Sequence, residues 1–85
     1  MGKIAVNKIK LFGFLAAFLA PEVELELPSE FDKATILTAL SNRFPHQKSD
    51  FVKCNVAVNQ VYIFDEVVKR DEVQEIAIIP PVSGG

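Results

Sequence analysis

The sequence predicts a single α+β domain in which a mixed sheet of four to five strands wraps round one main helix. Three patterns predict this class. Residues 22–27 alternate charged and apolar side chains, which is typical of a strand with one buried face. Residues 29–44 carry an apolar stripe at helical spacing, and several short strand-like runs follow. Because 85 residues are too few for two cores, we expect one domain, residues 1–79, and a flexible tail, residues 80–85.

The first half of the chain is expected to hold a strand, a short helical turn and a second strand. These elements cover residues 4–12, 14–20 and 22–27. Gly13 and Pro21 separate them, because glycine interrupts regular structure and proline cannot continue a helix. In the first strand, Ile9 and Leu11 share the face opposite to that of Phe12.

The main helix is expected within residues 29–44. Its stripe consists of apolar residues three and four positions apart, namely Ile36, Leu37, Leu40 and Phe44. Pro45 prevents the helix from continuing past Phe44. Two N-cap arrangements are open, one from Ser29 with Asp32 and one from Thr35.

Three further strands are expected after the helix. A polar loop leads to a strand over residues 51–58, and Asn59–Gln60 supplies the turn into the next strand, residues 61–64. A charged, turn-like segment, residues 65–71, precedes the last strand, residues 74–79. Cys54 is expected to be a small buried side chain in the first of these strands.

The alternation along the strands predicts an apolar patch on the outer face of the sheet. The side chains expected to face the helix are Ile9, Leu11, Val61, Ile63, Ile76 and Ile78. Phe12, Tyr62 and Ile79 then point away from the helix. Exposed large apolar side chains of this kind favour a docking patch for a partner over a region covered by a flanking loop.

Composition excludes several classes of partner. Nine Lys and Arg against eleven Asp and Glu give a net charge of −2 without a basic block, so we expect no nucleic-acid partner. The apolar run from Leu11 to Ala20 is shorter than the roughly 20 residues that span a bilayer, so we expect no membrane partner. One cysteine favours a reducing compartment, and we expect a cytoplasmic protein.

The side chains offer no catalytic or metal-binding constellation. Cys54 and His46 are the only residues of their types, and His46 lies in an expected loop without a second ligand. The four glycines form no phosphate-binding loop. We therefore expect no metal, no bound cofactor and no catalysis by the chain alone. The remaining reactive group is the carboxylate of Gly85.

The last residues of the sequence run from an apolar strand into two prolines and two glycines. Pro80 and Pro81 favour an extended path, so residues 80–85 are expected to project from the domain. Six residues span at most roughly 20 Å at about 3.3 Å each. Gly84 and Gly85 lack Cβ atoms and fit a narrow tunnel, and Val82 and Ser83 are expected to contact the same partner. The alternative is a frayed end.

Four segments resemble the sulfur-carrier small subunits of molybdopterin synthase, a family with the ubiquitin-like β-grasp fold. They are KIKLFG from Lys8, LPSEFDKATILTALSNRFP from Leu27, VAVNQ from Val56 and IAIIPPVSGG from Ile76. The resemblance covers most of the chain from Lys8 onward, and the final PPVSGG is its most specific element.

The resemblance implies a carrier in molybdenum cofactor biosynthesis. A ubiquitin-activating-type adenylating enzyme uses ATP to adenylate the Gly85 carboxylate, and a sulfurtransferase converts it to a thiocarboxylate. Gly84 and Gly85 then enter the large subunit of molybdopterin synthase, where the sulfur passes to a pterin precursor. The implied assembly is a heterotetramer of two small and two large subunits. The alternatives are carriers for thiamine or cysteine biosynthesis or tRNA thiolation, protein modifiers, and a non-catalytic interaction module.

Overall fold

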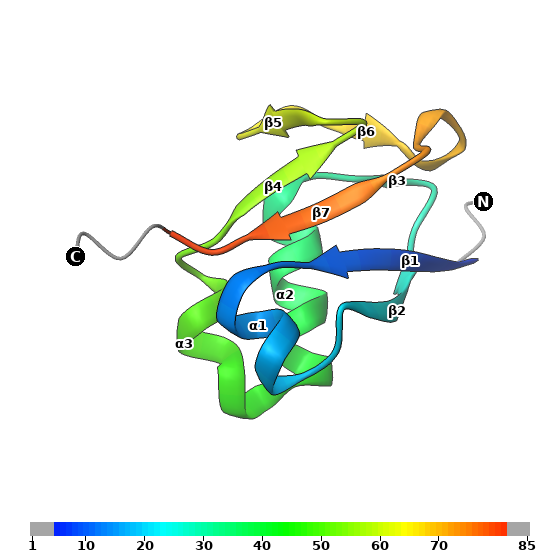
Figure 1. Ribbon diagram of the computed structural model, residues 1–85. Helices are drawn as coiled ribbons and strands as arrows, with labels where there is room; N and C mark the ends of the chain where they lie inside the picture. Colours follow the sequence, from blue (N-terminus) through cyan, green and yellow to red (C-terminus); the bar gives the residue numbers. More distant parts are fainter. Residues whose placement is uncertain (1–4, 82–85) are drawn as a thin grey trace.

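The computed structural model describes residues 5–81, which form a mixed sheet with helices on one side (Figure 1). The main sheet contains β1 (Ala5–Leu11), β2 (Glu22–Leu27), β4 (Asn55–Val58), β5 (Val61–Ile63) and β7 (Ile76–Ile79). Their spatial order is β2-β1-β7-β4-β5. The central strands β1 and β7 are parallel, and the other neighbours are antiparallel. This arrangement confirms the predicted α+β class and its mixed sheet.

The helices lie together on one side of the sheet (Figure 1). They are α1 (Gly13–Phe18), α2 (Lys33–Arg43) and α3 (Lys48–Phe51), with a short 3-10 turn at η1 (Pro45–Gln47). A second 3-10 turn, η2 (Arg70–Glu72), lies apart from these helices, in the loop that precedes β7 (Figure 1). A separate two-stranded sheet pairs β3 (Glu30–Phe31) with β6 (Val68–Lys69). Within residues 5–81, every helix falls short of the length and apolar character needed to cross a membrane.

The hydrophobic core lies between α2 and the sheet. Three members of the predicted helical stripe, Ile36, Leu37 and Leu40, are buried, and Phe44 is partly buried against them. The sheet contributes rows of buried side chains that align across strands, such as Leu11, Ile78, Val56 and Ile63. Each such side chain contributes about 1.5–3 kcal/mol through burial, so these rows fix which face of the sheet meets the helices.

Asp32 is the N-cap of α2. Its carboxylate accepts hydrogen bonds from the Thr35 backbone N–H and the Thr35 hydroxyl, both at 2.8 Å. The bond from the Thr35 backbone is the main reason why the pKa of Asp32 lies below its usual value. The helix therefore begins after Asp32, and the sequence-based alternative with Thr35 as the cap is wrong.

The strand predicted over residues 51–58 is wrong in its first half, because β4 begins only at Asn55. Phe51 and Cys54 are both buried and lie three residues apart, which suits a helical turn better than the alternation of a strand. The Cys54 backbone N–H bonds to the Phe51 carbonyl at 3.0 Å. The expected polar loop is likewise helical, and His46 is an exposed residue of η1.

The turn predicted at Asn59–Gln60 is confirmed, and both residues have positive φ angles, 53° and 70°. Paired positive φ values are the signature of a tight hairpin turn whose twist matches that of the strands. The segment expected to be turn-like, residues 65–71, also contains β6 and the start of η2. The last strand begins at Ile76, two residues later than expected.

Candidate functional site

The chain leaves the sheet at the end of β7, beside the connection between β1 and α1. Because β1 and β7 are parallel, their C-terminal ends lie at the same edge, with Leu11 opposite Ile78 (Figure 1). Pro80 is partly buried at this point and Pro81 is exposed. Gly13 packs against Pro80 with a left-handed φ of 60°. The four predicted site residues Val82, Ser83, Gly84 and Gly85 lie outside the described residues.

Asn59 holds the segment that leads into β7. Its side-chain amide donates to the Glu72 carbonyl at 3.0 Å, and its carbonyl accepts from the N–H groups of Gln74 and Glu75 at 2.7 and 3.0 Å. The Asn59 backbone N–H also bonds to the Glu75 carbonyl at 2.8 Å. The hairpin between β4 and β5 therefore fixes where β7 starts, and thus where the chain emerges at Pro80.

The face of the sheet opposite the helices carries one row of side chains that crosses all five strands. In order they are Tyr62, Ala57, Ala77, Lys10 and Glu22. The two alanines are buried between larger neighbours. The row is therefore apolar at the β5 end and charged at the β2 end.

Phe12 and Ile79 extend the apolar half of this face toward the chain exit. Continuing the register of β1 and β7 by one residue places Phe12 opposite Ile79. Phe12 and Tyr62 are exposed to 46% and 45%, and Ile79 is partly buried. The structure thus brings the three residues of the predicted docking patch onto one face. Their docking role stays a prediction.

Val61 lies on the predicted face of the sheet but is 64% exposed. Its partner Val58, on the same face, is buried. The reason for the difference is that β5 is an edge strand, so within residues 5–81 Val61 has a neighbouring strand on one side only. The other five residues expected to face the helix are buried.

Two aromatic residues of α1 enlarge the exposed apolar surface near the exit, and sequence reasoning did not single them out. Phe14 and Phe18 form an edge-to-face pair with ring centroids 6.2 Å apart, and Phe18 is 71% exposed. Their spacing of four residues on a helix was the signal that could have found them. We call the residues Phe12, Phe14, Phe18, Tyr62 and Ile79 the exit surface.

Lys10 and Glu75 form an ion pair in the charged half of the outer face. The Lys10 Nζ lies 2.6 Å from a Glu75 carboxylate oxygen, and each partner stabilises the charged form of the other. This hydrogen bond raises the pKa of Lys10 and lowers that of Glu75. Such exposed pairs add little stability, so the pair mainly sets the pattern of charge on this face.

Cys54 does not offer a reactive thiol. Cys54 is buried as predicted, its thiol donates to the Asp50 carbonyl at 3.3 Å, and burial raises its pKa to about 11. Within residues 5–81, no three His, Cys, Asp or Glu side chains are grouped to hold a metal ion. The described residues therefore hold the chain in a defined position at Pro80, with exposed apolar side chains nearby.

Comparison with known proteins relates this architecture to one family. Residues 9–85 match the sequence model of the ThiS family. The chain is 36% identical over 81 residues to a protein from Dictyostelium discoideum named molybdopterin synthase sulfur carrier subunit. That alignment covers 92% of this chain and 94% of the Dictyostelium protein.

A solved structure has the same fold. The solution structure of small archaeal modifier protein 1 from Methanosarcina acetivorans superposes with a TM-score of 0.66 and 26% sequence identity. The superposition covers 99% of this chain and 100% of that protein. This similarity confirms the ubiquitin-like β-grasp fold that the sequence predicted.

Proposed function

The chain belongs to the ThiS family, and we propose that it is the sulfur carrier of a molybdopterin synthase. One observation carries the proposal: similarity to the Dictyostelium sulfur carrier subunit extends over nearly the whole of both chains. The match to the family also includes residue 85. The similarity is therefore one of sequence as well as of fold.

The proposed reactive group is the carboxylate of Gly85. A carboxylate is a poor electrophile, so an adenylating enzyme first joins it to AMP, with loss of pyrophosphate from ATP. A sulfurtransferase then supplies sulfur, which a thiol reductant releases from the persulfide of that enzyme as sulfide. The sulfide attacks the carbonyl carbon, and AMP leaves. The product is a thiocarboxylate, whose sulfur is a nucleophile toward a pterin precursor. Gly84 allows a closely fitting tunnel to surround the backbone, because it lacks a Cβ atom.

The geometry at the end of β7 supports this use of the last residues. Asn59 and Gly13 position the chain at Pro80, so residues beyond Pro81 start from a defined point on the domain. The exit surface adds exposed or partly exposed apolar side chains on this part of the domain, two of them on β-strands and three on the β1–α1 segment. A partner that takes up Val82, Ser83 and the two glycines therefore also meets Phe12, Tyr62 and Ile79.

The proposed partners are the large subunit of molybdopterin synthase, the adenylating enzyme and the sulfurtransferase. We propose a cytoplasmic assembly of two small and two large subunits. Because Cys54 is buried with a raised pKa, it is a poor alternative carrier of sulfur. The sulfur is then held on the main chain rather than on a thiol.

Intact-protein mass spectrometry tests the proposal. The purified chain is incubated with an adenylating enzyme, ATP and a sulfurtransferase, and the mass is measured with and without sulfur donor. We expect the gain that corresponds to replacement of one oxygen by sulfur. Fragmentation should place the change on Gly85.

Two variants make the result specific. Removal of Gly85, or addition of one alanine after it, should abolish the mass change while the folded domain is retained. Val67→Ala changes an exposed residue that is not part of the exit surface, and this variant should load normally. Loading of the chain that lacks Gly85, or a sulfur located on Cys54, would contradict the proposal.

A protein modifier is the second candidate, because the similar archaeal structure carries that name. The same activated Gly85 carboxylate would then form an isopeptide bond with a lysine of another protein. Expression of a tagged chain followed by peptide mass spectrometry distinguishes the two functions. Branched peptides ending in Gly84–Gly85 on lysines support the modifier, and a thiocarboxylate without such branches supports the sulfur carrier.

A further inference from the structure

Among residues 5–81, β2 is an edge strand of the main sheet and has β1 as its one neighbouring strand. The Leu11 N–H bonds to the Pro21 carbonyl at 2.9 Å, which sets the phase of hydrogen bonding between β1 and the segment containing β2. Opposed residues in antiparallel strands alternate between bonded and non-bonded pairs. The odd-numbered residues of β2 therefore bond to β1, and the N–H and C=O groups of Glu22, Glu24 and Glu26 point outward.

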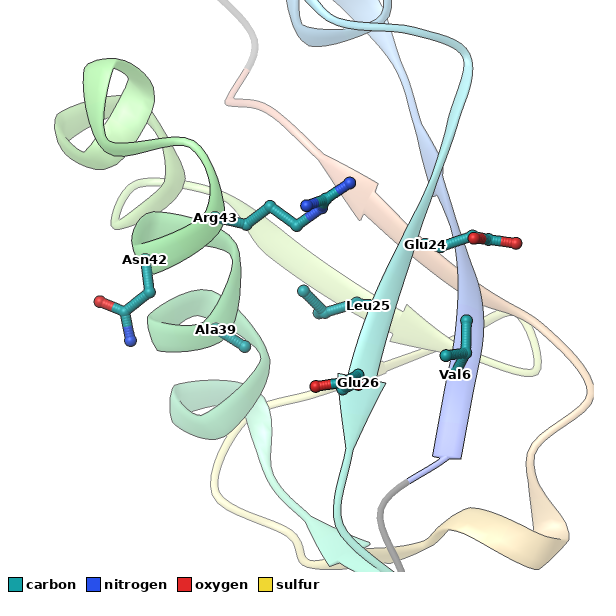
Figure 2. Close-up of a pocket in the computed structure, with 7 residues that line it drawn as sticks. All are labelled: Val6, Glu24, Leu25, Glu26, Ala39, Asn42 and Arg43. Carbon is teal, nitrogen blue, oxygen red and sulfur yellow. The ribbon is translucent and has the colours of Figure 1, made fainter.

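A groove runs alongside this edge, between β2 and α2. Its first part has a volume of about 610 Å³ and is lined by Val6, Glu24, Leu25, Glu26, Ala39, Asn42 and Arg43 (Figure 2). A second part, of about 540 Å³, shares Glu26, Ala39 and Asn42 with the first. Residues on both faces of β2 line the groove, Glu24 and Glu26 on the outer face and Leu25 on the face toward α2. The groove therefore follows the edge of the strand.

Apart from Arg43, the residues that α2 contributes to the groove have small or medium-sized uncharged side chains. They are Ala34, Thr35, Thr38, Ala39 and Asn42. Such side chains let another backbone approach the edge closely. Arg43 lies at one end, and Figure 2 shows its side chain extending from α2 toward β2.

The outer face beside the groove is acidic. Glu22, Glu24 and Glu26 are all exposed there. Lys10 stands opposite Glu22 but is paired with Glu75, and Lys8 stands opposite Glu24. Glu26 faces Val6, which carries no charge. The C-terminal end of β2, where Glu26 lines both parts of the groove, therefore has a surplus of negative charge.

We propose that the β2 edge binds an extended segment of another protein as an additional strand. Its main chain pairs with the outward N–H and C=O groups of Glu22, Glu24 and Glu26, as in other cases of strand addition. Basic side chains of the segment lie beside Glu24 and Glu26 on the outer face. The intervening side chains are apolar and point toward Leu25 and the small residues of α2.

A second copy of this chain is a poor occupant of the same edge. Two β2 strands paired with each other would place their glutamate rows side by side, and like charges opposite one another destabilise a sheet. The acidic row thus selects a basic segment and disfavours self-association. The occupant also leaves Tyr62 and Ile79 uncovered, because β1 lies between β2 and the strands β7, β4 and β5. The inference goes beyond the proposed function, since it does not depend on the chemistry of Gly85.

Nuclear magnetic resonance with the full-length chain tests the proposal. The probe is a capped synthetic peptide that alternates lysine with valine over eight residues. The first control peptide alternates glutamate with valine. The second has the same composition as the probe, but its four lysines and four valines stand in two separate blocks. We expect the probe to slow amide hydrogen exchange at Glu22, Glu24 and Glu26 at least about tenfold, and to leave Val23 and Leu25 unchanged.

Substitutions at Glu24 separate the role of charge from that of the backbone. Glu24→Gln keeps the strand edge and should weaken binding of the probe about two- to fivefold. Glu24→Pro also removes an outward N–H, and should weaken binding at least tenfold without loss of the pairing to β1. Glu72→Gln, an exposed change in η2, should have no effect.

Three outcomes would overturn the proposal. The first is an absence of amide protection on β2 at saturating probe. The second is equal binding of the block-composition peptide, which would show attraction between charges without strand pairing. The third is sedimentation of the free chain as a dimer that Glu24→Pro converts to monomer. If the proline variant does not fold, the glutamine variant and the exchange pattern still decide between these outcomes.

Discussion

Gly13 packs against Pro80 so closely that a Cβ atom at Gly13 would lie 3.0 Å from Pro80 Cγ. Gly13 also has a left-handed φ of 60°, which side chains disfavour. The turn between β1 and α1 and the exit of the chain from β7 are therefore fitted to each other through one glycine. This contact helps to hold the start of the C-terminal segment at the end of the sheet.

Gly13→Ala should destabilise the domain by about 1–2 kcal/mol from the backbone conformation alone. The contact with Pro80 adds a further cost. Urea unfolding measures the total, and the double variant Gly13→Ala with Pro80→Ala should recover only the part due to contact. Equal stability of the Gly13→Ala variant and the natural chain would show that the turn relaxes freely.

The long periodic elements were predictable from sequence because each has a strong local signal. Alternation fixed the faces of β2, and the stripe of Ile36, Leu37 and Leu40 identified α2. The pair β3 and β6 was not predictable, since two-residue strands carry no periodic pattern. The turn from Phe51 to Cys54 was predicted as a strand. Over so few residues, the positions of the apolar side chains are compatible with both the strand period of 2 and the helical period of 3.6.

The candidate site was predictable in part. The sequence pointed to the outer-face position of Phe12, Tyr62 and Ile79, because parity follows from the strands alone. It could not show that Gly13 meets Pro80, since those residues are far apart in sequence and their contact depends on the parallel pairing of β1 and β7. The groove along β2 depends on how α2 lies across the sheet, which no local pattern specifies.

Gln60→Gly should stabilise the domain by about 0.5–1 kcal/mol. Gln60 has a φ of 70°, and glycine adopts this conformation without steric cost. Asn59→Gly is the matched control, because it relieves the same kind of conformation but removes three side-chain hydrogen bonds to residues 72–75. We expect that control to be destabilising by about 1–3 kcal/mol. Thermal unfolding of both variants tests whether the melting temperature rises for Gln60→Gly and falls for Asn59→Gly.

The cap of α2 should make stability depend on pH in the acidic range. The pKa of Asp32 is lower in the folded chain, so its stabilising contribution is fully present above the unfolded value of about 3.9. It is lost as the pH falls through the folded value. Asp32→Asn retains a cap but removes this titration. The melting temperature of the variant should therefore fall less between about pH 6 and pH 3, and an identical fall would contradict the assignment.

Cys54 should be protected from alkylation in the folded chain. Burial raises its pKa to about 11, so little thiolate is present near pH 8. Iodoacetamide should modify the native chain at least about a hundredfold more slowly than the chain unfolded in guanidinium, where the thiol pKa is about 8.5. Rapid native labelling would show that the segment around Cys54 opens. Cys54→Ala should still be loaded with sulfur if Gly85 is the carrier.

Tyr62→Ala should weaken binding to the molybdopterin synthase large subunit at least tenfold. Tyr62 is 45% exposed and ends the apolar row at β5, and aromatic side chains commonly dominate the energetics of an interface. The variant should retain its thermal stability, because much of the side chain already faces solvent. Isothermal titration calorimetry with the purified large subunit provides the dissociation constant.

Val67→Ala is the matched control for this prediction, because Val67 is 64% exposed but lies outside the exit surface. Its dissociation constant should equal that of the natural chain. Loss of binding in both variants would point to a general effect on the fold, and retention of binding in both would remove Tyr62 from the interface. A selective loss in Tyr62→Ala, with Gly85 still open to adenylation, would separate docking by the outer face from chemistry at the end of the chain.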